Sequence, residues 1–286
     1  MEIVHDALDM QARCAALKRE GKRIALVPTM GWLHDGHLSL LREGRKRADV
    51  LALSVFVNPL QFGAGEDFDA YPRNLMRDAA LAEKTGADLL FAPRRDALYP
   101  ADFSTHVEVS GLTETLCGKS RPGHFRGVAT VVTKLFNIVR PDVALFGRKD
   151  FQQLAVIRRM VRDLDMGIEV VGMPIVREAD GLAMSSRNTY LGADERRQAL
   201  VLVESLRLAQ SLAKGGETDA ASVLAKVTAR IGQEPLARLD YAQICHDETL
   251  ADMEKITANS VLLLAVYFGA TRLIDNAYLL KDELPK

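Results

Sequence analysis

The sequence PTMGWLHDGHLSL occupies residues 28–40, between a short apolar run and a helical pattern. In a parallel α/β sheet, ligands bind where a strand ends and the next helix begins, so this stretch marks the expected position of a site. His34 and His37 are three residues apart around Gly36, and both side chains can therefore face one ligand. The N-terminus of a helix offers backbone N–H groups and the positive end of its dipole to a phosphate. The pattern predicts a phosphate-binding turn after the first strand.

The two histidines have other interpretations. Histidines at this spacing can bind a metal ion, but no third or fourth ligand lies nearby in the sequence. They can also be ordinary residues of a helix start. The preceding strand and the PTMG segment favour the phosphate-binding turn, in which Gly36 permits close approach of the backbone. Histidine donors there could stabilise the charge that develops on a triphosphate under attack.

The first 175 residues alternate between predicted strands and predicted helices. Strands are expected at residues 23–27, 50–57, 88–91, 142–146 and 168–172. Helices are expected at residues 38–47, 74–84, 128–139 and 151–163. This alternation predicts a parallel sheet with helices on both faces, a Rossmann-like α/β arrangement. Pro28 is expected to end the first strand.

The remainder of the chain changes character. Helices are expected at residues 194–214 and 218–231, and strands at residues 240–245, 261–268 and 271–278. Asp194 is the predicted N-cap of the first of these helices, and Gly215-Gly216 its end. The pattern predicts a small α+β domain. We therefore expect two domains, residues 1–174 and residues 175–286, with the linker between them carrying residues 178–188.

Composition narrows the function. Lysine and arginine total 37 and aspartate and glutamate 38, a net charge of −1, so we expect no nucleic-acid partner. The longest apolar run, residues 261–268, is too short to span a bilayer, and residues 1–10 lack the hydrophobic segment of a signal peptide. We expect no membrane partner. The three cysteines form neither a metal motif nor a disulfide framework, which favours a reducing, cytoplasmic location.

The His34-Asp-Gly-His37 turn resembles that of the adenylyl-transfer superfamily, which includes cytidylyltransferases and class I aminoacyl-tRNA synthetases. Residues 28–40 as a whole resemble the pantothenate synthetase family. Further blocks of that family follow in its order: VFVNPLQF at 55–62, YPR at 71–73, LCG at 116–118, RPGHF at 121–125, FGRKDFQQ at 146–153 and MSSRN at 184–188. Together they span almost the whole chain.

This resemblance implies roles for individual residues. The expected catalytic residues are His34, His37 and Lys149. Gln61 and Gln153 are expected to bind the acid and amine substrates, pantoate and β-alanine. The residues expected to bind ATP are Met30, Gly31, His34, Gly36, His37, Gly147, Arg148, Lys149, Asp150, Val176, Met184, Ser185, Ser186 and Arg187.

Residue types alone leave these roles open. Lys149 could be a surface lysine at a helix start, and either glutamine could be a solvated polar residue. Residues 184–187 could be a polar linker. Arg148 stands where the family usually has an acidic or amide residue, and Trp32 stands where it usually has a smaller one, so the contacts of both are open.

Metal binding is also an expectation from the resemblance. Mg²⁺ should accompany ATP, bridging phosphate oxygens with few protein ligands. The metal ligands are unknown, with Asp78 and Asp150 as possible contacts. We interpret His106 and His124 as structural, and residues 66–69 as a solvated acidic loop rather than a cation site.

The reaction implied by the resemblance is ATP-dependent. Pantoate would attack the α-phosphorus to give pantoyl adenylate and pyrophosphate, and β-alanine would then displace AMP. The second domain would act as a lid over the reactive adenylate, and the family is typically homodimeric. Two alternatives stay open: a nucleotidyltransferase that moves AMP onto a phosphate ester and shares the histidine turn, and, from another class, a non-catalytic nucleotide-binding or regulatory protein.

Overall fold

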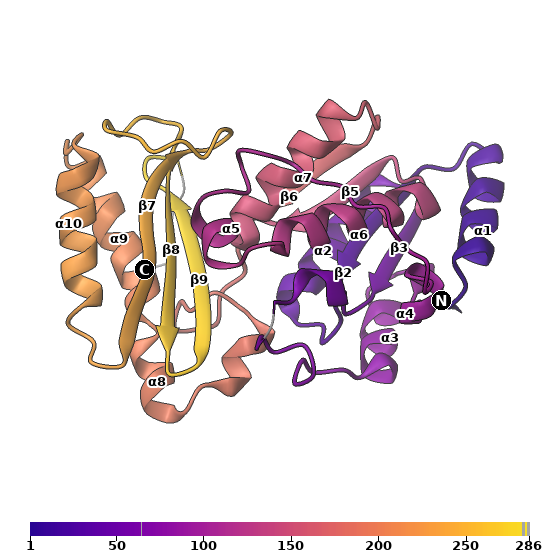
Figure 1. The fold of residues 1–286 in the computed structure, drawn as a ribbon, viewed down its shortest axis with the longest axis horizontal. Helices are drawn as coiled ribbons and strands as arrows, with labels where there is room; N and C mark the ends of the chain where they lie inside the picture. The colour runs from indigo at the N-terminus through magenta and orange to yellow at the C-terminus, as the bar shows by residue number, and fades with distance from the viewer. Residues whose placement is uncertain (64, 282–283, 285–286) are drawn as a thin grey trace. The chain divides into compact units, whose positions relative to one another are not determined.

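The computed structural model describes residues 1–63, 65–281 and 284. The chain forms two compact units. The first unit comprises Met1–Arg148 and Val156–Pro174, and the second comprises Lys149–Ala155 and Ile175–Lys286. Figure 1 shows the elements of both.

A six-stranded parallel sheet is the framework of the first unit. Its strands are β1 (Glu2–Val4), β2 (Ile24–Thr29), β3 (Val50–Val55), β4 (Leu89–Phe91), β5 (Val143–Gly147) and β6 (Glu169–Met173). They lie in the order β1-β4-β3-β2-β5-β6, and every neighbouring pair is parallel. The chain builds outward from β2 to one side and then returns to β5 on the other. The carboxyl ends of β2 and β5 are therefore the topological switch point, where such sheets bind ligands.

Helices cover both faces of this sheet. They are α1 (Ala7–Arg19), α2 (Asp35–Arg47), α3 (Leu75–Lys84), α4 (Arg95–Leu98), α5 (Leu116–Ser120), α6 (His124–Val139) and α7 (Phe151–Asp163). Successive strand side chains point to opposite faces. Leu53 and Leu145 join the buried cluster beneath α2 and α3. Phe146 points the other way, and its ring packs against Phe136 of α6 with centroids 6.5 Å apart. The continuous apolar runs of these strands follow from burial on both faces.

The second unit contains a three-stranded antiparallel sheet. Its strands are β7 (Ala237–His246), β8 (Ser260–Phe268) and β9 (Thr271–Tyr278), in that order. Its helices are α8 (Ala193–Gln198), α9 (Val201–Lys214) and α10 (Ala220–Ile231). Leu206 of α9, Val223 of α10 and Val266 of β8 share one buried cluster, so both helices pack on the sheet (Figure 1). A buried ion pair between Arg177 and Asp275, with N–O distances of 2.6 and 2.9 Å, ties the start of this unit to β9.

The predicted fold class is confirmed: a parallel α/β sheet with helices, followed by a smaller α+β domain. The single helix expected at residues 194–214 is wrong, because α8 ends at Gln198 and α9 begins at Val201. After Ala193, α8 carries only polar residues, so it cannot continue the apolar stripe of α9. Gly192, not Asp194, is the N-cap.

Further elements differ from the prediction. β2 continues through Pro28 to Thr29, although Pro28 was expected to end it. β1, α1, α4 and α5 were not predicted at all. β1 spans three residues, too few to show a periodicity, and it forms because it pairs with β4.

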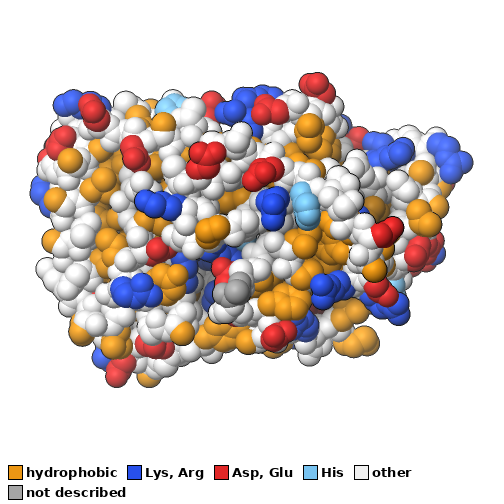
Figure 2. Space-filling model, in the orientation of Figure 1, with side chains coloured by type: hydrophobic (Ala, Val, Ile, Leu, Met, Phe, Trp, Pro, Cys, Tyr) orange, Lys and Arg blue, Asp and Glu red, His pale blue; other side chains and the backbone are white. Residues whose placement is uncertain are grey.

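The distribution of surface charge and the lengths of the helices are relevant to the nucleic-acid and membrane partners that we did not expect. Figure 2 shows basic and acidic side chains interspersed over the viewed face, as the net charge of −1 suggests. Within the described part of the chain, none of the helices has the length and apolarity to cross a membrane.

The contact between α6 and the segment after β3 depends on a glycine. A Cβ on Gly127 would lie 2.6 Å from the backbone N of Gln61 and would overlap the carbonyl of Leu60. Asn58 Nδ2 donates to the Gly127 carbonyl oxygen at 3.1 Å. The 3₁₀ turn η1 (Pro59–Gln61) therefore packs directly on the helix backbone.

We expect Gly127→Ala to destabilise the protein by about 1–3 kcal/mol, because the added methyl must push backbone atoms apart. Gly232→Ala is the matched control: its Cβ would lie 3.4 Å from the nearest atom and its backbone is right-handed helical. Urea unfolding followed by circular dichroism measures both. Equal midpoints for Gly127→Ala and the unmodified protein would contradict the packing argument.

Candidate active site

The two histidines of the β2–α2 turn cap the helix together. His34 is the N-cap of α2, and its Nδ1 accepts a hydrogen bond from the backbone N–H of Gly36 at 3.1 Å. In return, His37 Nδ1 accepts from the backbone N–H of His34 at 3.3 Å. The two rings lie 4.1 Å apart, centroid to centroid. This reciprocal pair replaces the Ser/Thr and Glu/Gln of a usual capping box.

These hydrogen bonds determine the tautomer of both rings. Because Nδ1 of each ring accepts a hydrogen bond, the proton of the neutral imidazole must be on Nε2. Each ring therefore carries its N–H on Nε2, the nitrogen that does not take part in the cap. Two such donors at a helix N-terminus suit a phosphate group, where the helix dipole also favours negative charge.

Gly36 is required by the packing of the rings. A Cβ at this position would lie 2.8 Å from His34 Cε1 and 2.9 Å from Nδ1. Any other residue would displace the His34 ring. Gly36 therefore leaves room for the His34 ring, in addition to the close approach of the backbone to a ligand that we expected of it.

The turn before the helix has an unusual backbone. Gly31 and Trp32 have φ values of +85° and +51°, so two successive residues are left-handed. For tryptophan this conformation costs about 1–2 kcal/mol. The buried carboxylate of Asp78, on α3, accepts hydrogen bonds from the backbone N–H groups of Trp32 and Leu33, each at 2.8 Å. Asp78 is therefore a poor candidate for a metal ligand, because both of its oxygens already accept hydrogen bonds from backbone N–H groups.

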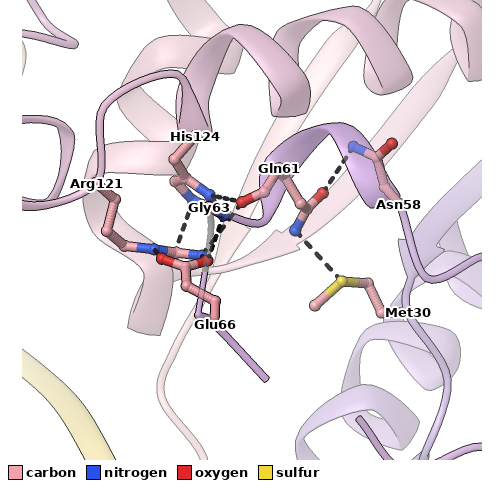
Figure 3. A network of polar contacts seen from close by, with 7 residues as sticks. All are labelled: Met30, Asn58, Gln61, Gly63, Glu66, Arg121 and His124. Carbon is pink, nitrogen blue, oxygen red and sulfur yellow. Dashed lines mark hydrogen bonds and ion pairs between the residues drawn. The ribbon is translucent and has the colours of Figure 1, made fainter. Parts of the chain in front are cut away.

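Gln61 lies at the end of η1 with its side chain buried. Its Oε1 accepts from Asn58 Nδ2 at 3.1 Å, which orients the amide (Figure 3). Its Nε2 then points to the sulfur of Met30 at 3.3 Å. A thioether is a weak acceptor. The Gln61 N–H group is thus arranged to gain a better partner when an oxygen-bearing ligand is present.

Two further side chains hold the backbone of Gln61. The Gln61 carbonyl oxygen accepts a hydrogen bond from His124 Nδ1 at 2.8 Å and another from Arg121 Nη2 at 3.3 Å. Arg121 forms a bidentate pair with Glu66, both N–O distances being 2.6 Å (Figure 3). The interpretation of residues 66–69 as a solvated loop is therefore wrong for Glu66, and His124 has the structural role that we expected.

The pKa of Glu66 reflects this pairing. Burial alone would raise it, but the hydrogen bonds and the charge of Arg121 outweigh burial, so the pKa lies below its ordinary value. Glu66 therefore stays ionised at neutral pH. No sequence pattern links Glu66 to Arg121, which are 55 residues apart and meet only in the fold.

The remaining predicted residues belong mainly to the second unit. Lys149 lies in η2 (Arg148–Asp150), and its carbonyl oxygen accepts from Asn276 Nδ2 of β9 at 2.9 Å. Asp150 is exposed, and Gln153 is half-buried in the first turn of α7. These positions place the lysine where a chain segment leaves β5 and enters a helix.

The serine segment and Val176 come together. The N–H of Met184 donates to the Val176 carbonyl at 3.0 Å, and residues 177 and 183 form a β-bridge. Ser185 caps the 3₁₀ helix η3 (Ser186–Tyr190) by accepting from the N–H of Arg187 at 3.2 Å. η3 also contacts β9, the strand whose Asn276 holds Lys149.

The structure thus gathers the predicted residues in two groups. In the first unit, Met30, Gly31, His34, Gly36, His37 and Gln61 follow β2 and β3, and Gly147 and Arg148 lie at the end of β5, at the same sheet edge. In the second unit, Lys149 and the group Val176, Met184, Ser185, Ser186 and Arg187 border β9. Sequence reasoning missed Asn58 and Arg121 as supports of Gln61, although both stand inside the quoted family blocks.

A helix capped by two histidines after the central strand of a Rossmann-like sheet defines the H-x-G-H adenylyl-transfer class. Comparison with known proteins narrows this class. The family model described as pantoate-beta-alanine ligase matches residues 2–278. The chain therefore belongs to the pantoate–β-alanine ligase family, and it is an enzyme, an ATP-dependent acid–amine ligase.

Individual relatives agree with this assignment. The pantothenate synthetase of Syntrophotalea carbinolica is 59% identical, over 99% of this chain and 100% of that protein. The crystal structure of pantothenate synthetase from Thermus thermophilus is 47% identical, with a TM-score of 0.93, over 98% of this chain and 100% of that one. The pantoate-β-alanine ligase of Francisella tularensis, complexed with beta-gamma ATP and β-alanine, is 33% identical, with a TM-score of 0.82, over 98% of each chain.

We expect Glu66→Gln to destabilise the protein at pH 7 by about 0.5–1.5 kcal/mol, allowing for partial solvent screening of the ion pair. A carboxylate with a lowered folded pKa contributes stability above its unfolded pKa, near 4.3, and loses it as pH falls through the folded value. The difference in free energy of unfolding between the unmodified protein and Glu66→Gln should therefore shrink as the pH falls from 5 to 3.

Urea midpoints across this pH range measure the effect. Asp96→Asn is the control, because Asp96 and its partner Arg94 are both exposed and such pairs contribute little. A Glu66→Gln difference that stays constant from pH 7 to pH 3 would show that ionisation of Glu66 is not its source.

Proposed function

We propose that this chain condenses (R)-pantoate with β-alanine in two steps. The pantoate carboxylate attacks the α-phosphorus of ATP, forming pantoyl adenylate and releasing pyrophosphate. The β-alanine amine then attacks the acyl carbon and releases AMP. The observation that carries this proposal is the reciprocal His34–His37 cap at the start of α2. The relative from Francisella tularensis supports it, since it binds a nucleotide and β-alanine.

His34 and His37 act in the first step. Negative charge increases on the phosphate oxygens as the carboxylate attacks and pyrophosphate departs. The Nε2–H donors of both rings are held in place by the cap, so they need not reorganise when this charge develops. The proposal requires no protein nucleophile, because positioning and charge stabilisation suffice for this chemistry.

Gln61 and Gln153 bind the pantoate. The Nε2 of Gln61 points to the sulfur of Met30, and a hydroxyl or carboxylate oxygen of the acid would be a stronger acceptor. Because Asn58 occupies Oε1, the amide cannot turn over without losing that bond. Gln153, on α7 just after η2, supplies a second amide for the same substrate.

Lys149 and the serine segment bind ATP. Asn276 holds the backbone of Lys149, while the lysine side chain stays a flexible point charge suited to phosphate. Residues 184–187 offer hydroxyls and a guanidinium for the same group. In the proposal, residues 1–174 form the nucleotide- and pantoate-binding domain, and residues 175–286 form a lid that keeps water from the adenylate.

Mg²⁺ fits the site as a companion of ATP. In the described part of the chain, no three His, Cys, Asp or Glu side chains gather as a metal site. Mg²⁺ is commonly held by one or two carboxylates together with substrate phosphates. Asp150, exposed beside Lys149, has the donor chemistry for this, whereas the Asp78 oxygens accept backbone N–H groups. When bound, the ion would neutralise charge on the phosphates.

The proposed partners are small molecules: ATP, pantoate and β-alanine. The homodimeric state and the cytoplasmic location stay predictions, supported by the family resemblance and the cysteine pattern. An analytical ultracentrifuge run on the purified chain measures the first.

We expect pantoyl adenylate to form without the amine, because β-alanine attacks only the activated acid. The chain is mixed with Mg-ATP and labelled pantoate, quenched, and analysed for adenylate and pyrophosphate; β-alanine is then added and AMP is followed. Pyrophosphate release that needs a phosphate ester instead of pantoate would favour a nucleotidyltransferase. No release with any acid would favour a non-catalytic nucleotide binder.

We expect His37→Ala to lower the rate of adenylate formation by about 10²–10³ while the fold persists, because one preorganised donor is lost. His246→Ala, at the end of β7, is the control and should keep the original rate. Rapid-quench kinetics on both variants, with circular dichroism as the check on folding, decide the matter. A folded His37→Ala variant that forms adenylate at the original rate would remove His37 from the mechanism.

A further inference from the structure

We infer that Asp78 is a positioning residue for adenylate formation: its carboxylate holds the β2–α2 turn in the conformation that presents His34 and His37. The inference rests on the proposed function. Asp78 contacts the backbone of the turn, and it acts on the reaction through the two histidines.

The burial and bonding of Asp78 are the first support. Its side chain is 1% exposed, and a buried carboxylate is unfavourable unless its oxygens are satisfied. Oδ2 accepts from the N–H of Trp32 and Oδ1 from the N–H of Leu33, both at 2.8 Å. Hydrogen bonds from N–H groups to an ionised carboxylate are about twice as strong as those to a neutral acceptor. The carboxylate therefore fixes both amides of the turn.

The backbone of the turn explains why such an anchor is needed. Gly31 and Trp32 are left-handed in succession, which makes adjacent N–H groups converge on one point. The carboxylate packs directly against Gly31, where an added Cβ would lie 2.9 Å from Asp78 Oδ2. Left-handed tryptophan is an unfavourable conformation that surrounding contacts must maintain.

Arg77 braces the same turn from the solvent side. Its Nη2 donates to the Leu33 carbonyl at 2.9 Å, and its Nη1 lies 3.3 Å from Asp78 Oδ1. Its guanidinium also stacks over the Trp32 ring, 4.8 Å from the centroid. Both faces of the turn are thus held by consecutive residues of α3.

The turn leads without a break into the histidine cap. Leu33 is fully buried, and the next residue is His34, whose N–H donates to His37 Nδ1. A displaced turn would carry the His34 backbone with it and open the reciprocal cap. The donors would then leave the positions at which charge develops, and a misplacement of about 1 Å can reduce a rate about 10²-fold.

The test compares Asp78→Asn with a matched carboxylate at the opposite end of β2. Asp142 Oδ2 accepts from the N–H of Ile24 at 2.7 Å, and its Oδ1 pairs with Lys18 at 2.6 Å. Asp142→Asn therefore removes a carboxylate that holds the start of β2, away from the histidines. Asparagine at position 78 would place an NH₂ group against a backbone N–H.

We expect Asp78→Asn to fold and to lower kcat for adenylate formation by about 10- to 100-fold, with the KM for pantoate changed less than about threefold. Asp142→Asn should keep the original kcat. Trp32 is the chain's only tryptophan, so its fluorescence reports on the turn directly. Its emission should shift in Asp78→Asn and stay unchanged in Asp142→Asn.

Several results would overturn the inference. These are an unchanged kcat in Asp78→Asn, an equal loss of kcat in Asp142→Asn, or recovery of the Asp78→Asn kcat by excess Mg²⁺, which would make Asp78 a metal ligand.

If Asp78→Asn does not fold, Arg77→Ala tests the turn from its exposed side, with an expected fall in kcat of about three- to tenfold. An unchanged kcat there would also overturn it. Absence of adenylate formation by the unmodified protein would instead count against the proposed function.

Discussion

The hydrogen bonds from the Trp32 and Leu33 N–H groups to the buried carboxylate of Asp78 are the constraint on which the site depends. They hold two successive left-handed residues, and that turn sets the direction in which the chain enters α2. The helix N-terminus and its two histidines follow from it. The left-handed turn is unfavourable by itself, and the buried carboxylate maintains it. In return, the two N–H groups of the turn compensate the cost of burying the carboxylate.

A second constraint acts at the end of β3. Asn58 uses its amide N–H on both Gln61 and the Gly127 carbonyl, while its Oδ1 accepts from the Tyr99 hydroxyl at 2.9 Å. Because its donors and acceptor are all engaged, it can adopt one orientation, and that orientation aims the Gln61 N–H toward Met30. The glycine in α6 lets the helix come close enough for this arrangement. The order of the strands then brings this corner and the histidine turn to one sheet edge.

Local patterns predicted the elements whose signals are local. The β-branched and apolar runs gave the strands β2 to β6, and the period of α7 gave its bounds, Phe151–Asp163, without error. The prediction failed where an element depends on its partners. β1 is a strand because it pairs with β4. The pairing of Glu66 with Arg121 joins residues that share no local pattern.

The sequence by itself predicted the class of this protein, because the spacing of His34 and His37 around Gly36, placed between a strand and a helix, favours a phosphate-binding turn. The further blocks identified the family. The tertiary structure decided which groups support those residues: Asp78 turned out to bind backbone, Glu66 to pair with Arg121, and Asn58 to orient Gln61. The physical reason is that a motif fixes the chemistry carried by a short segment, whereas the orientation of each side chain is set by hydrogen bonds from residues distant in sequence, which only the folded chain brings within reach.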